Sequence, residues 1–113
     1  MKTIYAIDFL EDKFFTVEIP VMSENDTMYF LDYDRLTYEQ KSATDWNIAV
    51  DKDKEGTYNW TTDKDNFNQI KENFIKNRIF QLQEDVNYAN SVLNTAVASA
   101  YELGVNRWII YLI

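Results

Sequence analysis

The sequence contains no cysteine and no histidine, and only two glycines and one proline among its 113 residues. Without cysteine, the chain has neither a disulfide framework nor thiolate ligands for zinc or iron–sulfur clusters. Without histidine, it lacks serine–histidine–aspartate catalysis and histidine-ligated transition metals. No apolar run approaches the ~20 residues that a membrane-spanning helix needs. Any acid–base chemistry would therefore depend on carboxylates, lysine or tyrosine.

Negative charge dominates what is present, with 19 acidic and 11 basic residues and a net charge of −8. Residues 1–65 hold 15 acidic and 7 basic side chains, whereas residues 66–113 hold four of each. This balance argues against direct binding to nucleic acid or to an anionic membrane. Asp8, Glu11 and Asp12 interrupt the apolar core that a signal peptide would require. We therefore expect a cytoplasmic protein.

The acidic part has the two-residue periodicity and the β-branched and aromatic composition of strands. In residues 14–21, Thr16, Glu18 and Pro20 alternate with apolar side chains, which predicts one solvent-exposed face. Pro20 cannot donate a backbone hydrogen bond, so we place it at a sheet edge or a strand end. The predicted strands are residues 3–10, 14–21, 28–33, 46–50 and 57–60, the last two forming a hairpin.

From Thr62 the hydrophobic period changes to about 3.5 residues, and Thr62 with Asp65 is typical of a helix start. Gly104 is a natural helix stop. The upstream Phe67, Ile70 and Phe74 lie one position out of phase with the later stripe, so the helix is long or broken near residue 75. The stripe follows the a and d positions of a heptad repeat: Ile75, Ile79, Leu82, Val86, Ala89, Leu93, Ala96, Ala100 and Leu103.

Two interpretations of this stripe stay open. It is either the face of a helix that packs on the sheet, or a homodimeric coiled coil with Ile75, Ile79, Leu82 and Val86 as self-association residues. No charge occurs between Asp85 and Glu102, so we expect the second half of the helix to be buried against the sheet.

Together these patterns predict an α+β fold in a single domain, residues 1–113. An acidic, β-rich part (1–61) supplies an antiparallel N-terminal sheet of about five strands. A helical part (62–103) packs a long or broken helix on that sheet, and residues 105–113 form a short terminal strand.

Residues 51–56 resemble the first half of an EF-hand calcium loop, because Asp51, Asp53, Glu55 and Gly56 occupy its first, third, fifth and sixth positions. The twelfth position is Thr62 rather than a bidentate glutamate. We therefore interpret the segment as an acidic hairpin tip and predict no metal site and no cofactor.

Asp32 and Asp34 are two residues apart at the end of the predicted strand 28–33. A spacing of two on a strand places both side chains on one face, so these carboxylates could converge as in a carboxylate-based enzyme. No histidine and no phosphate-binding motif accompanies them. We therefore predict a protein that is not an enzyme and has no catalytic residues.

Tyrosine and tryptophan alternate with acids in the first half of the chain, a combination typical of protein interfaces. The partner of such a surface would be basic. The candidate partner-binding residues are Asp32, Tyr33, Asp34, Tyr38, Glu39, Asp45, Asp51, Asp53, Glu55, Trp60, Asp63 and Asp65.

In size, negative charge, absence of cysteine and histidine, and abundance of Asn, Ile and Tyr, the chain resembles small acidic inhibitors encoded by phages and mobile elements. These include anti-CRISPR proteins, anti-restriction DNA mimics and inhibitors of DNA-repair enzymes. The resemblance implies carboxylates that stand in for phosphates in the groove of a nuclease or another nucleic-acid-binding protein. One alternative is an immunity protein or antitoxin against a nuclease toxin, and another is a self-associating structural or assembly protein.

Overall fold

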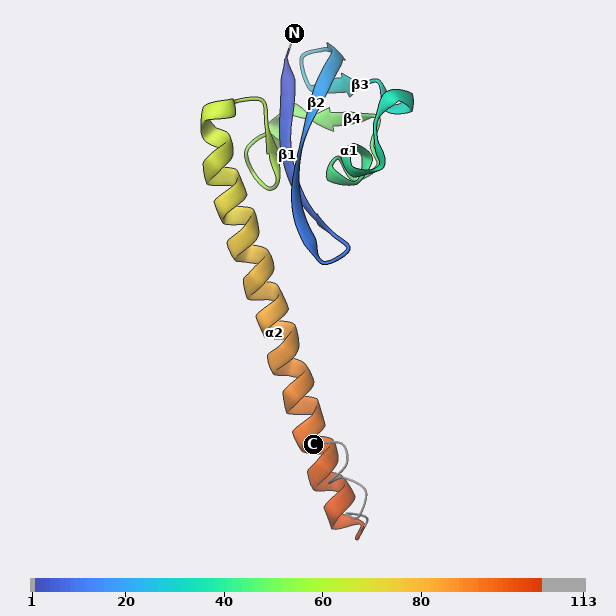
Figure 1. Ribbon diagram of the computed structural model, residues 1–113, viewed down its shortest axis with the longest axis vertical. Helices are drawn as coiled ribbons and strands as arrows, with labels where there is room; N and C mark the ends of the chain where they lie inside the picture. The colour runs from blue at the N-terminus through green and yellow to red at the C-terminus, as the bar shows by residue number, and fades with distance from the viewer. Residues whose placement is uncertain (1, 105–113) are drawn as a thin grey trace. The chain divides into compact units, whose positions relative to one another are not determined.

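The computed structural model describes residues 2–104, which form two compact units that divide after Lys76. The first unit contains a five-stranded antiparallel half-barrel, and a long helix follows it, as the sequence predicts (Figure 1). The strands are β1 (Thr3–Leu10), β2 (Lys13–Glu24), β3 (Met28–Leu31), β4 (Ala49–Asp51) and β5 (Trp60–Thr61), in the sheet order β4-β3-β2-β1-β5. The helices are α1 (Tyr38–Ala43) and α2 (Phe67–Glu102), with single 3₁₀ turns η1 (Tyr33–Arg35), η2 (Lys52–Lys54) and η3 (Lys64–Asn66).

Strand β1 is apolar on both faces because a different helix covers each face. Ile4 and Ala6 belong to one buried cluster, together with Ala43 of α1. Ile7 belongs to a second cluster, together with Phe67 and other residues from the first turns of α2. Successive side chains of a strand point to opposite faces, so the continuous apolar run of residues 3–10 is what a strand between two layers requires.

Strand β2 has the solvent-exposed face that its sequence predicts, since Thr16, Glu18 and Pro20 are all exposed. The placement of Pro20 at an edge or a strand end is wrong, because Pro20 lies inside β2, which is a central strand. Residues 13–20 pair with β1, whereas pairing with β3 begins at Val21 and includes a bulge before Ser23. Pro20 therefore occupies the junction between the two pairings, where its missing N–H removes no ladder hydrogen bond.

The predicted hairpin between residues 46–50 and 57–60 is also wrong. Strand β4 pairs with β3, and β5 pairs with β1, so the two strands lie at opposite edges of the sheet. Segment 52–59 therefore connects the two edges of the half-barrel instead of forming a hairpin tip. Val50 and Trp60, from the two edge strands, meet in the same buried cluster.

The hydrophobic pattern of α2 changes phase near residue 75, and the buried part of the helix ends at this point. Phe67, Ile70 and Phe74 are the buried residues of α2, and they pack with Ile7 of β1. The expectation that the second half of the helix is buried is wrong: Val92 is 50% exposed and Leu93 45% exposed. The absence of charge after Asp85 predicted burial, but in this single chain nothing covers that face of the helix among the described residues.

Gly104 has a left-handed backbone (φ +76°), and its N–H donates a hydrogen bond to the Tyr101 carbonyl at 3.0 Å, so it ends α2 as predicted. The terminal strand predicted for residues 105–113 lies outside the described residues. Within residues 2–104, no helix is long and apolar enough to cross a membrane.

Candidate functional site

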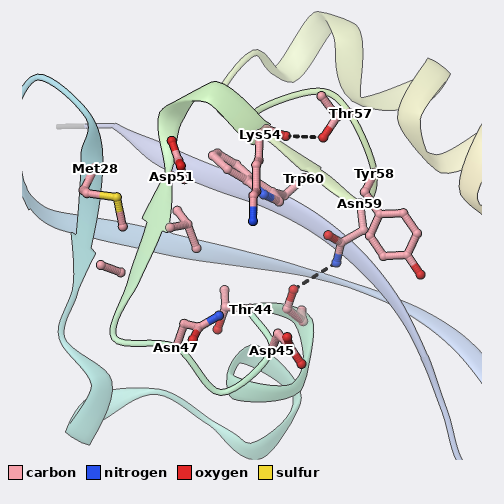
Figure 2. Close-up of a pocket in the computed structure, with 13 residues that line it drawn as sticks. Met28, Thr44, Asp45, Asn47, Asp51, Lys54, Thr57, Tyr58, Asn59 and Trp60 are labelled. Atoms are coloured by element: carbon pink, nitrogen blue, oxygen red, sulfur yellow. Dashed lines mark hydrogen bonds between the residues drawn. The ribbon is translucent and has the colours of Figure 1, made fainter.

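A cavity of about 430 Å³ lies where the two edge strands and the end of α1 approach one another (Figure 2). Its apolar lining includes Val50 and the buried Trp60. Asp45 and Asp51 contribute carboxylates to its wall, and the side chain of Lys54 extends into the space between the lining residues. The cavity thus combines apolar lining residues with charges of both signs.

The turn after α1 places Asp45 and Trp46 at this site. The Asp45 N–H donates to the Ser42 carbonyl at 3.0 Å, and the Trp46 N–H donates to the Lys41 carbonyl at 2.8 Å, which is a Schellman motif. Both Asp45 (φ 56°) and Trp46 (φ 61°) adopt left-handed backbone conformations. Such conformations cost about 1–2 kcal/mol per non-glycine residue, so tertiary packing holds this turn in place.

Asn59 connects the turn to the sheet. Its buried side-chain amide donates to the Ile7 carbonyl at 3.0 Å and to the Ala43 carbonyl at 2.9 Å. The Ile7 N–H in turn donates to the Asn59 carbonyl at 2.9 Å. Figure 2 shows the amide nitrogen of Asn59 directed toward the end of α1. One residue therefore fixes β1, α1 and the segment before β5 to one another.

A second cavity of about 450 Å³ adjoins the first and has a different chemistry. Its polar walls are Asp8, Ser42, Asp45 and Asn59, and its aromatic walls are Trp46 and Tyr58. Asp8 continues the face of β1 that carries Ile4 and Ala6, and its carboxylate accepts a hydrogen bond from the Ser42 hydroxyl at 2.7 Å. No lysine or arginine lines this second cavity within the described part of the chain.

Glu55 has an internal structural role. Its carboxylate accepts hydrogen bonds from the Thr62 hydroxyl at 2.7 Å, the Thr62 N–H at 3.1 Å and the Tyr29 hydroxyl at 3.2 Å. Partial burial tends to raise the pKa of Glu55, but the hydrogen bonds from Thr62, Tyr29 and Thr61 outweigh it and lower this pKa below its usual value. The Tyr29 ring lies near two ammonium groups, those of Lys2 and Lys52, at 5.2 and 4.9 Å from its centroid.

The structure brings together some of the predicted partner-binding residues. Asp45, Asp51 and Trp60 line the first cavity, although Trp60 is only 7% exposed and therefore serves the core instead of a surface. Tyr38 is exposed and packs nearly edge to face on Trp46, with ring centroids 5.2 Å apart. Asp53 lies in η2 and is adjacent in the sequence to Lys54, which lines the first cavity.

The other predicted residues are dispersed. Asp32 pairs with Arg35 at 3.3 Å, and Asp65 lines a separate depression together with Lys64 and Lys71. The Lys41 ammonium lies 4.5 Å from the centroid of the Tyr33 ring. The remaining three acids are exposed in η1, in α1 and before η3: Asp34, Glu39 and Asp63.

Sequence reasoning missed Asp8, Trp46, Tyr58 and Asn59. The sequence did contain an indication for Asp8. This residue follows Ile4 and Ala6 at two-residue spacing, which places its carboxylate on the buried face of the strand. No comparable signal marks Tyr58 or Asn59, because only the crossing of segment 52–59 between the sheet edges brings them beside α1.

Within residues 2–104, no group of three or more acidic side chains converges as a metal site would require. In the partial EF-hand pattern, Asp51 is the N-cap of η2 and Asp53 lies within this turn. The Asp51 carboxylate accepts a hydrogen bond from the Asp53 N–H at 2.9 Å. Comparisons with models of protein families, with curated proteins and with solved structures found no match to this chain.

Proposed function

We propose that this chain is a non-enzymatic acidic inhibitor that binds a basic nucleic-acid-binding protein, in the manner of a DNA mimic. The observation that carries the proposal is the exposed carboxylate of Asp45 beside the exposed rings of Trp46 and Tyr38 at the end of α1, with the half-buried Asp51 lining the same cavity as Asp45. Within residues 2–104, Asp45, Asp51 and Asp53 form no ion pair, whereas Trp46 is 47% and Tyr38 55% exposed. Carboxylates raise the rate of association with a cationic groove, and aromatic side chains supply contact energy.

The first test is capture of partners from a host lysate on the immobilised full chain, eluted with a salt gradient. We expect a basic nuclease or other nucleic-acid-binding protein that moderate salt releases and that added duplex DNA displaces. A nuclease toxin as the captured protein would favour an immunity protein or antitoxin. Retention that does not depend on salt would contradict charge mimicry.

A matched pair of variants makes this test specific. The combination Asp45→Asn, Asp51→Asn and Asp53→Asn removes the charges of two residues that line the cavity and of Asp53 in η2, while preserving side-chain shape. The control combination Asp12→Asn, Asp26→Asn and Glu84→Gln removes three exposed charges elsewhere. We expect the first combination to weaken capture at least about tenfold and the control to weaken it much less. Equal losses would indicate only an effect of net charge.

A second candidate function, self-association through α2, is supported by the exposure of the heptad stripe, with Ile79 55% and Val86 54% exposed. β-Branched residues at a positions with Leu82 at a d position favour a parallel two-stranded coiled coil. In a parallel dimer the g positions of one helix face the e positions of the other. Arg78 would then lie opposite Gln83, and Asp85 opposite Asn90, so these pairs bring no like charges together. Light scattering after size-exclusion chromatography tests this directly, since a monomer mass at all accessible concentrations would exclude it.

A further inference from the structure

The second cavity, which Asp8, Ser42, Asp45, Trp46, Tyr58 and Asn59 line, has the composition of an organic-cation site. Its volume of about 450 Å³ lies within the ~300–1,000 Å³ range of ligand sites. Two carboxylates supply negative charge, and two aromatic rings supply faces on which a flat cation can stack. The neighbouring 430 Å³ cavity differs because Lys54 lines it.

Neighbouring aromatic residues hold both rings of this cavity. Trp46 packs on Tyr38, and Tyr58 packs on Phe74 with ring centroids 5.4 Å apart. Trp46 also occupies a backbone conformation that the Schellman turn after α1 fixes. Less side-chain entropy is therefore lost when a ligand binds, because these large side chains are already ordered.

The carboxylates are arranged to accept further hydrogen bonds. Each oxygen of Asp8 already accepts one hydrogen bond, from the Phe9 N–H at 2.8 Å and from the Ser42 hydroxyl at 2.7 Å, and each has a second lone pair. The side chain of Asp45 has no hydrogen-bond or ion-pair partner among residues 2–104. A donor with several N–H groups in one plane would satisfy these acceptors better than a single ammonium group.

We propose that this cavity binds the guanidinium group of an arginine side chain from the basic partner. The inference rests on the proposed function and deepens it, because it identifies which partner residue is bound and where. The guanidinium would stack against Trp46 while donating hydrogen bonds to Asp45 and Asp8. Arginine is favoured over lysine because only arginine combines a planar face with multiple donors.

The test compares hexa-arginine with hexa-lysine binding to the full chain at low salt, by calorimetry and by amide NMR shifts. We expect hexa-arginine to bind about tenfold more tightly and to shift the amides of Ser42, Asp45 and Tyr58. Trp46→Gly removes the ring while glycine accepts the left-handed backbone, so the fold is retained and the preference for arginine should be lost. Asp45→Asn should weaken hexa-arginine binding more than the control Asp26→Asn does.

The outcomes separate this inference from the proposed function. Equal binding of the two peptides, or a preference for arginine that persists in Trp46→Gly, would overturn the arginine site and leave the acidic binding surface in place. Failure of the wild-type chain to bind either peptide at low salt would overturn the proposed function, and the arginine site with it.

Discussion

The side-chain amide of Asn59 donates a hydrogen bond to the backbone carbonyl of Ala43, the last residue of α1, at 2.9 Å. The same amide also satisfies the Ile7 carbonyl of β1. These bonds hold the turn that carries Asp45 and Trp46 against the sheet, so the candidate site depends on one buried asparagine.

Asn59→Ala should lower the free energy of unfolding by about 2–4 kcal/mol, because it leaves two buried carbonyl groups without donors. Urea denaturation measures this change. Asn68→Ala is a suitable control because Asn68 is exposed in α2, and we expect it to stay within about 0.5 kcal/mol of wild type. A loss at Asn59 no larger than at Asn68 would show that water replaces the amide without cost.

Asp45→Gly should raise the free energy of unfolding by about 0.5–1 kcal/mol, since glycine adopts the left-handed conformation at φ 56° without steric cost. The same variant should weaken binding of hexa-arginine. Asp34→Gly, at a position without positive φ, should not stabilise the chain. Thermal unfolding measures the stability of both variants. Destabilisation by Asp45→Gly would mean that the Asp45 side chain itself supports the turn.

Glu55→Gln should lower the free energy of unfolding by about 1–2 kcal/mol at neutral pH, because the Thr62 N–H and hydroxyl share a carboxylate oxygen that an amide replaces incompletely. The folded-state pKa of Glu55 lies below its usual value of 4.5. Its stabilising contribution is therefore present above pH 4.5 and is lost as the pH falls through the lower, folded-state pKa.

Unfolding measured across this acidic range should show the wild type and Glu55→Gln converging. Asp53→Asn, two residues earlier and exposed, provides the charge-matched control and should remain within about 0.5 kcal/mol of wild type. A difference between wild type and Glu55→Gln that stays constant from neutral pH to well below pH 4.5 would contradict the role assigned to the ionised carboxylate.

If α2 mediates self-association, Leu82→Asp should raise the dimer dissociation constant about a hundredfold or more, because two carboxylates would meet at a d position. Phe80 is also exposed but lies off the stripe, so Phe80→Asp should leave the dimer intact. Sedimentation equilibrium distinguishes these outcomes. Equal effects of the two substitutions would show that the heptad stripe is not the interface.

The sequence by itself determined the features that depend on local periodicity and composition. The bounds of β1, the exposed face of β2, the end of α2 at Gly104 and the concentration of acids before residue 66 were all predictable. Each follows from neighbouring residues, because alternation, helical phase and backbone preference are local properties.

Only the tertiary structure decided which strands pair and which side chains meet. Segments 46–50 and 57–60 have the pattern of a hairpin, yet β4 and β5 pair with different strands, because burial in a half-barrel depends on contacts between distant residues. That crossing brings Tyr58 and Asn59 beside Asp8 of β1 and Asp45 after α1. Spacing along the chain carries no information about this meeting, so the candidate site appears only in the folded protein.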